Sequence, residues 1–162
     1  MNASSKRWRS MSRLRALEEE RRRPKSMPWE ERGKVLELLR GLLYERGEVL
    51  LAVVHGGFAS SNIFRDVDVA VYTGYAVSYD SEPVYVDELR ETLEERAGLP
   101  IDVQLLDYAP PSFRLAALKG KLLFEKTCGL RATLRLHAAE ELEALQLKRR
   151  KALRWCSCPK ST

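Results

Sequence analysis

Apolar residues recur at helical spacing in the segment between Pro28 and Gly47, which predicts the first helix of the chain. Pro28 and the acidic pair Glu30 and Glu31 suit the first turn of a helix, and Gly47 suits its end. The apolar positions fall every three or four residues, so they form one stripe. The stripe consists of Val35, Leu38, Leu39, Leu42 and Leu43.

Short apolar runs farther along predict the strands of a small sheet, and the segments between them predict helices. Gly56 and Gly57 predict a turn between the first two strands, and Thr73–Pro83 predicts a polar loop. With no internal repeat, this order indicates an α/β (α+β) fold: a small mixed sheet, flanking helices and a long C-terminal helix. The predicted strands are Glu48–Val54, Asp66–Tyr72, Ile101–Leu106 and Leu122–Glu125, and the further helices are Val86–Ala97, Ser112–Leu118 and Leu130–Trp155.

Charge is distributed unevenly along the 162 residues, whose formal net charge is +5. Residues 1–27 carry nine Lys or Arg and three Asp or Glu, and residues 148–162 carry six basic residues and no acid. The intervening body is therefore acidic. We predict a basic, disordered or loosely helical extension (1–27), one domain (28–155) and a short tail (156–162).

Cysteine usage and hydropathy favour a cytoplasmic protein. The odd set of three cysteines is no disulfide framework, and Cys156 and Cys158 lack a nearby partner pair for a metal. The longest uninterrupted apolar run, Val49 to Val54, is far shorter than a membrane span. No apolar signal segment opens the chain.

Two aspartates in the second predicted strand carry the strongest chemical signal. Asp66 and Asp68 project from the same face of a strand, with Cα atoms about 6.6 Å apart. The valines between and after them then face the core. Two carboxylates at this spacing repel each other unless a cation lies between them, and hard oxygen ligands favour Mg²⁺. Taken alone, the pair equally suits the exposed face of an edge strand.

The residues around this pair add to the case for a nucleotide site. Glycines let a backbone approach phosphate oxygens closely, and Gly56 and Gly57 end the preceding strand. The hydroxyls of Ser60 and Ser61 follow. Asp102 supplies a third carboxylate on a predicted neighbouring strand.

Gly-Gly, eight intervening residues and then Asp-Val-Asp resembles the signature of the minimal nucleotidyltransferases (MNT), small members of the DNA polymerase β-like superfamily. The likeness extends through PPSFRLAALKGKLLFEK and covers roughly residues 29–155. It implies a nucleotidyltransferase fold. It also implies that the catalytic and metal-binding residues are Asp66, Asp68 and Asp102, and that the nucleotide-binding residues are Gly56, Gly57, Ser60, Ser61 and Arg65.

The resemblance implies Mg²⁺-dependent transfer of a nucleoside monophosphate, AMP from ATP, to a protein hydroxyl, with two Mg²⁺ ions in the active complex. It further implies the antitoxin role in a pair with a HEPN-family toxin. The chain departs from the family where many relatives have Gly-Ser followed by arginines. Arg65, Ser60 and Ser61 are then the candidates to grip the phosphates.

Two alternatives stay open at this point. A catalytically degenerate protein of the same fold would bind its toxin, or a second copy of itself, through the long C-terminal helix. A nucleic-acid-binding module would depend on the basic ends, including Lys148–Lys151, but no interleaved aromatic residues support it. His55 is predicted to end a strand, and Tyr75 and Tyr79 either stack on a base or pack locally.

Overall fold

The computed structural model describes residues 15–16, 19–20 and 23–156, with side chains described as far as residue 152. Much of the predicted basic extension, and all but the first residue of the predicted tail, therefore lie outside the described residues. The division of the chain into extension, domain and tail stays a prediction.

Four strands form a mixed sheet in the order β5-β4-β2-β6. They are β2 (Leu51–His55), β4 (Val67–Tyr72), β5 (Ile101–Leu105) and β6 (Lys121–Glu125). β2 pairs antiparallel with β4 and β6, whereas β4 and β5 run parallel. Parallel strands need a crossover connection, which here contains α4 (Glu82–Ala97). The predicted small mixed sheet with flanking helices is confirmed.

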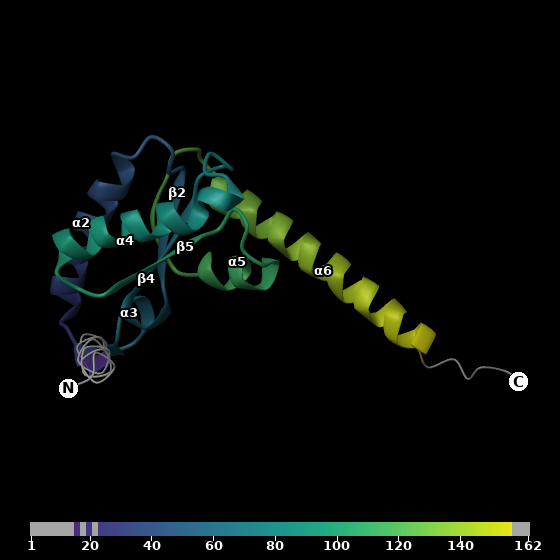
Figure 1. The fold of residues 1–162 in the computed structure, drawn as a ribbon, viewed down its shortest axis with the longest axis horizontal. Coiled ribbons are helices and arrows are strands. Elements are labelled where there is room, and N and C mark those ends of the chain that lie inside the picture. The colour runs from purple at the N-terminus through teal and green to yellow at the C-terminus, as the bar shows by residue number, and fades with distance from the viewer. Residues whose placement is uncertain (1–14, 17–18, 21–22, 157–162) are drawn as a thin grey trace, which may run out of the picture.

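Two helices, α2 (Trp29–Tyr44) and α4, pack on one face of this sheet and contact each other. Figure 1 shows them together, on the side of the strands away from α5. The alternate apolar side chains of β4 enter the core beneath them, as its alternating pattern predicts. The buried residues of this core include Leu39 and Leu43 of α2, Val67, Val69 and Val71 of β4, and Leu89 and Leu93 of α4.

The other face of the sheet carries a second, smaller core under α5 (Pro111–Ala117) and the first turns of α6 (Leu130–Cys156). The aspartate-bearing face is therefore largely covered, and only its end near Asp68 is partly open. The sequence pattern does not predict this cover, because Ala70 and Tyr72 alone form no clear apolar alternation. The buried members are Leu51, Val53, Ala70, Leu106, Ala117, Leu118 and Leu134.

The connection from β2 to β4 is more regular than the sequence predicts. Gly56 and Gly57 are the first two residues of the short helix α3 (Gly56–Ser60), so the prediction of a plain turn is wrong. After α3, β3 (Ile63–Phe64) pairs antiparallel with β1 (Lys25–Ser26). Elements this short contain too few residues to show a hydrophobic period, so the pattern could not predict them.

The loop after β4 also begins to fold earlier than predicted. It contains one turn of 3-10 helix, η1 (Tyr79–Ser81), and α4 starts at Glu82 instead of the predicted Val86. The predicted end of α4 is confirmed. Gly98 has a φ of 67° and donates its N–H to the carbonyl of Glu94 at 2.8 Å, which is a common way for a helix to end.

The long predicted C-terminal helix is confirmed as α6, and it leaves the domain part-way along its length. Leu134 and Ala138 are buried in its first turns. Every side chain from residue 143 to residue 152 is exposed, and Figure 1 shows this part projecting away from the sheet. Within the described ranges, no helix is both long enough and apolar enough to cross a membrane.

Candidate active site

Asp68 and Asp102 lie side by side on neighbouring strands. β4 and β5 pair in parallel with the Cα atoms of these two residues as direct partners, and on the other side His55 of β2 is the partner of Asp68. Directly paired residues project from the same face of a sheet, with backbones about 4.8 Å apart. Three strands therefore place one imidazole and two carboxylates together, on the face opposite α2 and α4.

The carboxylate of Asp68 lies in an unfavourable electrostatic environment. Its pKa is raised from 3.8 to about 6, first by burial and then by the negative charges of Asp66 and Asp102. Asp66, half-buried, directly precedes the first residue of β4. Asp66 and Asp102 are therefore both close enough to act on the charge of Asp68. The charges that act on Asp68 among the described residues are both negative, so they oppose its ionisation.

A metal ligand set is not preformed at this place. Within the described part of the chain, no three His, Cys, Asp or Glu side chains are arranged as a metal-binding group. The assignment of Asp66, Asp68 and Asp102 as metal ligands therefore stays a prediction. Their oxygen atoms are the hard donors that Mg²⁺ prefers, and this chemistry is consistent with the prediction.

Gln104 is a further polar residue that the sequence analysis missed. Its Nε2 donates a hydrogen bond of 2.9 Å to Oδ2 of Asp102, two residues earlier on the same face of β5. This bond orients the Asp102 carboxylate. The i,i+2 spacing in the IDVQLL run was the signal that could have revealed it.

His55 ends β2, as predicted, but it does so beside the carboxylates. Burial lowers its pKa and the charge of Asp102 opposes this only in part, so the ring is neutral at pH 7. Its Nε2 is buried and accepts or donates no hydrogen bond among the described atoms. The ring packs edge-on against Phe113 of α5, with centroids 5.7 Å apart.

Gly56 brings the backbone of α3 directly against Asp68. A Cβ atom on Gly56 would lie 2.1 Å from Oδ2 of Asp68, far inside van der Waals contact. Gly56 also has a φ of +70°, which other residues rarely adopt. At Gly57, which follows, an added Cβ atom would lie 3.4 Å from the carbonyl oxygen of Ile63, an ordinary contact distance. The close approach of backbone and carboxylate therefore requires glycine at position 56.

The three remaining predicted nucleotide ligands lie farther along this connection. The Ser60 hydroxyl donates to the carbonyl of Gly56 at 2.9 Å, and the Ser61 N–H donates to that of Gly57 at 2.8 Å. Ser60, Ser61 and Arg65 are all exposed. Ser60 and Ser61 thus stand at the C-terminal end of α3, whereas Gly56 and Gly57 stand beside the carboxylates.

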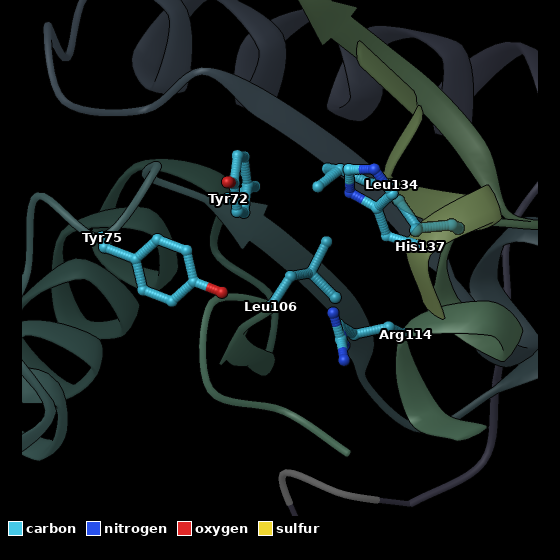
Figure 2. A pocket seen from close by; sticks show the side chains of 7 residues that line it. Tyr72, Tyr75, Leu106, Arg114, Leu134 and His137 are labelled. Atoms are coloured by element: carbon cyan, nitrogen blue, oxygen red, sulfur yellow. The ribbon is translucent and has the colours of Figure 1, made fainter. Parts of the chain in front are cut away.

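A separate cavity of about 120 Å³ lies at the other end of β4, where it is lined by Tyr72, four residues after Asp68 in the strand. Figure 2 shows Tyr75, Arg114 and His137 among the side chains that line it, with Leu106 lying between them in this view. The lining residues are Tyr72, Tyr75, Leu106, Arg114, Leu118, Leu134 and His137.

A buried carboxylate fixes the loop beside this cavity. Asp107 accepts hydrogen bonds from the N–H and the hydroxyl of Thr73 and from the N–H of Tyr75, which has a left-handed φ of 63°. The ring of Tyr75 packs edge-on against Tyr108, and so does that of Tyr79. Of the two interpretations of these tyrosines, local packing is the one seen.

Comparison with known proteins agrees with this geometry. The sequence pattern of the family "Polymerase beta, Nucleotidyltransferase" matches residues 37–128, more than half of the chain. The chain belongs to this nucleotidyltransferase family. The matched segment contains β2, α3, β4 and β5, and with them every predicted site residue. None of the curated proteins compared matches the chain.

Solved structures of MNT antitoxins share the fold of this nucleotidyltransferase. One is a complex of tri-AMPylated HEPN toxin with MNT antitoxin from Shewanella oneidensis, with a TM-score of 0.55, 15% identity, and coverage of 76% of this chain and 99% of that one. A toxin–antitoxin structure with AMP-PNP gives a TM-score of 0.60, 16% identity and coverage of 76% and 98%. The toxin–antitoxin structure of MntA–HepT gives a TM-score of 0.55 and 17% identity, and the match covers 78% of this chain and 97% of that one.

Because these identities are low, the solved structures establish the fold only. The roles of individual residues rest on the geometry of this chain. The predicted membership of the superfamily and the predicted enzyme class, nucleotidyltransferase, are confirmed. About a quarter of the chain lies outside each match, although nearly the whole of each related chain is covered. The nucleotidyltransferase therefore has the complete related fold and additional sequence.

Proposed function

We propose that this nucleotidyltransferase transfers AMP from ATP to a hydroxyl group of a partner protein, with Mg²⁺ bound by its carboxylates. The observation that carries the proposal is the direct pairing of Asp68 with Asp102, together with the raised pKa of Asp68. A site that gathers like charges on a well-formed sheet favours a cation and a polyphosphate as its missing partners.

Asp66, Asp68 and Asp102 would hold the metal, with two ions in the active complex. Bound Mg²⁺ would supply the positive charge that both the carboxylates and the nucleotide phosphates need. The three aspartates suit Mg²⁺ because their oxygen atoms are hard ligands, and because the ionised form of Asp68 is destabilised by its acidic neighbours.

The remaining residues would orient the two reactants. The side-chain-free backbone at Gly56 and Gly57 would approach phosphate oxygens bound next to Asp68, and Ser60, Ser61 and Arg65 would act on the phosphates farther out. Since Gln104 fixes Oδ2 of Asp102, Oδ1 is the atom available to accept a proton from the attacking hydroxyl. The hydroxyl oxygen forms a bond to the α-phosphorus of ATP, the bond to pyrophosphate breaks, and AMP remains on the acceptor.

The acceptor that we propose is a HEPN-family protein, with this nucleotidyltransferase as the antitoxin of the pair. Two related structures support this choice: a tri-AMPylated HEPN toxin bound to its MNT antitoxin, and a toxin–antitoxin complex with AMP-PNP.

The experiment is transfer of label from ATP labelled at the α-phosphate to a co-purified HEPN protein in the presence of Mg²⁺. We expect labelled HEPN protein with the wild type and none with Asp68→Asn combined with Asp102→Asn. Asp80→Asn is the matched control, because Asp80 is an exposed acid in the loop after β4. Label transfer by the double variant, or none by the wild type, would contradict the proposal.

A second candidate is a catalytically degenerate protein that only binds its partner. One observation favours it: the Ser60 hydroxyl is already bonded to the carbonyl of Gly56, and Ser61 and Arg65 are exposed beyond it. This candidate predicts a stable complex with the HEPN protein that neither ATP nor Asp68→Asn changes. The labelling experiment separates the two candidates.

A further inference from the structure

Arg32 of α2 is fully buried, with 1% of its surface exposed, although it carries a positive charge. A buried charge is strongly destabilising unless hydrogen bonds or an opposite charge satisfy it. The ion pairs found among the described residues do not include Arg32. Its surroundings must therefore stabilise the guanidinium by other means.

The guanidinium donates four hydrogen bonds to backbone carbonyls. One goes to Met27 at 3.0 Å, two residues before the start of α2. The other three go to the end of α3 and the residues after it: Phe58 at 2.9 Å, Ser61 at 2.5 Å and Asn62 at 2.8 Å. Carbonyls at the C-terminal end of a helix have no partner within that helix, so Arg32 supplies the donors that α3 lacks.

Aromatic rings enclose the same guanidinium. Its Cζ lies 4.4 Å from the ring centroid of Trp29, 5.0 Å from that of Phe64 and 5.3 Å from that of Phe58. Phe58 and Phe64 also pack edge-on against each other, at 4.9 Å. Ring faces attract a cation, and a planar fork of five donors is a property that only arginine has. The pocket is therefore shaped for arginine rather than lysine.

The consequence lies at the other end of α3. A helix of five residues has little stability of its own, so contacts outside it determine where it lies. Its first residue, Gly56, is pressed against Oδ2 of Asp68. Any shift of α3 along its axis would move that backbone relative to the carboxylate, and so change the surface beside which the nucleotide phosphates are proposed to bind.

We propose that Arg32 is a positioning residue for nucleotide binding: it holds α3 and the connection to β3, residues 56–64, at a fixed distance from Asp68. This inference rests on the proposed function for the importance of that distance. The holding itself is a property of the chain without nucleotide. The two parts can therefore be tested separately.

The test uses Arg32→Lys in the full-length protein, which keeps the charge but removes the fork of donors. Arg40→Lys is the matched control, because Arg40 is an exposed residue of the same helix that pairs with Glu37 at 3.6 Å. Amide hydrogen exchange without nucleotide should become about tenfold faster or more in residues 56–64 of Arg32→Lys, and stay unchanged in α4 and the sheet. Equal exchange in both proteins, or a uniform increase across the domain, would overturn the proposal.

The second measurement asks whether the position matters to the nucleotide. The Kd for AMP-PNP and the KM for ATP should rise about tenfold in Arg32→Lys, with kcat at saturating ATP little changed, as expected when only binding is lost. A merely structural role would lower the amount of active protein, and therefore kcat, at an unchanged KM. If the wild type binds no AMP-PNP, the proposed function fails, whereas the exchange result still decides whether Arg32 holds the connection.

Discussion

Replacing Asp68 with asparagine should stabilise the metal-free protein. Asparagine has nearly the shape of aspartate, so it fits beside Gly56 without a new clash. It removes a charge that burial, Asp66 and Asp102 all oppose. A residue that serves a ligand is commonly kept at a cost to folding, and its neutralisation then recovers stability.

The magnitude follows from the pKa. Its rise from 3.8 to about 6 in the folded protein corresponds to about 3 kcal/mol, at 1.36 kcal/mol for each pH unit. Solvent screening of this half-buried carboxylate reduces the expected gain to about 1–2 kcal/mol. For a chain of this length, that gain raises Tm by about 3–6 °C.

The pH dependence has a definite sign. A carboxyl whose pKa is raised on folding binds its proton more tightly in the folded state, so the wild type loses stability as pH rises from about 4 to about 6. Above this range, the wild type has lost all of the stability that depends on this proton. The advantage of Asp68→Asn should therefore be largest above pH 7 and should disappear towards pH 4.

Thermal unfolding in EDTA, at several pH values between 4 and 8, measures the effect. Asp80→Asn is the control for loss of one exposed acid and should shift Tm by less than about 1 °C. Addition of Mg²⁺ with AMP-PNP should raise the Tm of the wild type and leave that of Asp68→Asn almost unchanged. A Tm for Asp68→Asn equal to or below that of the wild type at pH 7.5 would refute the reasoning.

Three other substitutions test separate features. Gly56→Ala should lower the free energy of unfolding in urea by about 2 kcal/mol or more, because the new Cβ would collide with Asp68 and position 56 has a positive φ. Gly33→Ala in α2 is the control: its Cβ would meet no atom within 4 Å, so this change should be neutral or stabilising. Asp107→Asn should lower Tm, with a loss of about 1–3 kcal/mol, because an amide cannot accept all three hydrogen bonds of the loop after β4. Burial alone would raise the pKa of Glu48, but hydrogen bonds from its own backbone, Tyr85 and Arg46 outweigh burial, so the net effect is a lowered pKa. Glu48→Gln should therefore be less stable than the wild type at pH 7, and the two proteins should become equally stable in unfolding experiments below about pH 4.5.

The elements with a long hydrophobic period were predictable from the sequence. The stripe of α2, the alternation in β4 and the glycine after α4 each follow from local geometry, and all three are found where expected. Asp68 and Asp102 were expected on neighbouring strands. Their direct pairing depends on how the crossover through α4 sets the register, which no local pattern encodes.

The parts that the sequence did not reveal depend on contacts distant in the chain. Nothing in the local sequence distinguishes Arg32 from the other charged residues of α2, and three of its four hydrogen-bond partners lie 26 to 30 residues later. Gly56 was expected to make room for phosphate, and the structure adds a nearer reason, the carboxylate of Asp68. The cover over the aspartate-bearing face likewise depends on how α5 and α6 dock.

The exposed part of α6, residues 143–152, is a suitable place to attach a probe. Every side chain from residue 143 to residue 152 is exposed, so a fluorescent dye on Leu147→Cys, in a protein whose own three cysteines are replaced, would leave the sheet and the carboxylates undisturbed. An α-helix rises 1.5 Å per residue, so the dye would sit roughly 14 Å beyond Ala138, the last fully buried residue in the described part of α6. Its rotational freedom would then report the arrival of a partner protein at this end of the molecule.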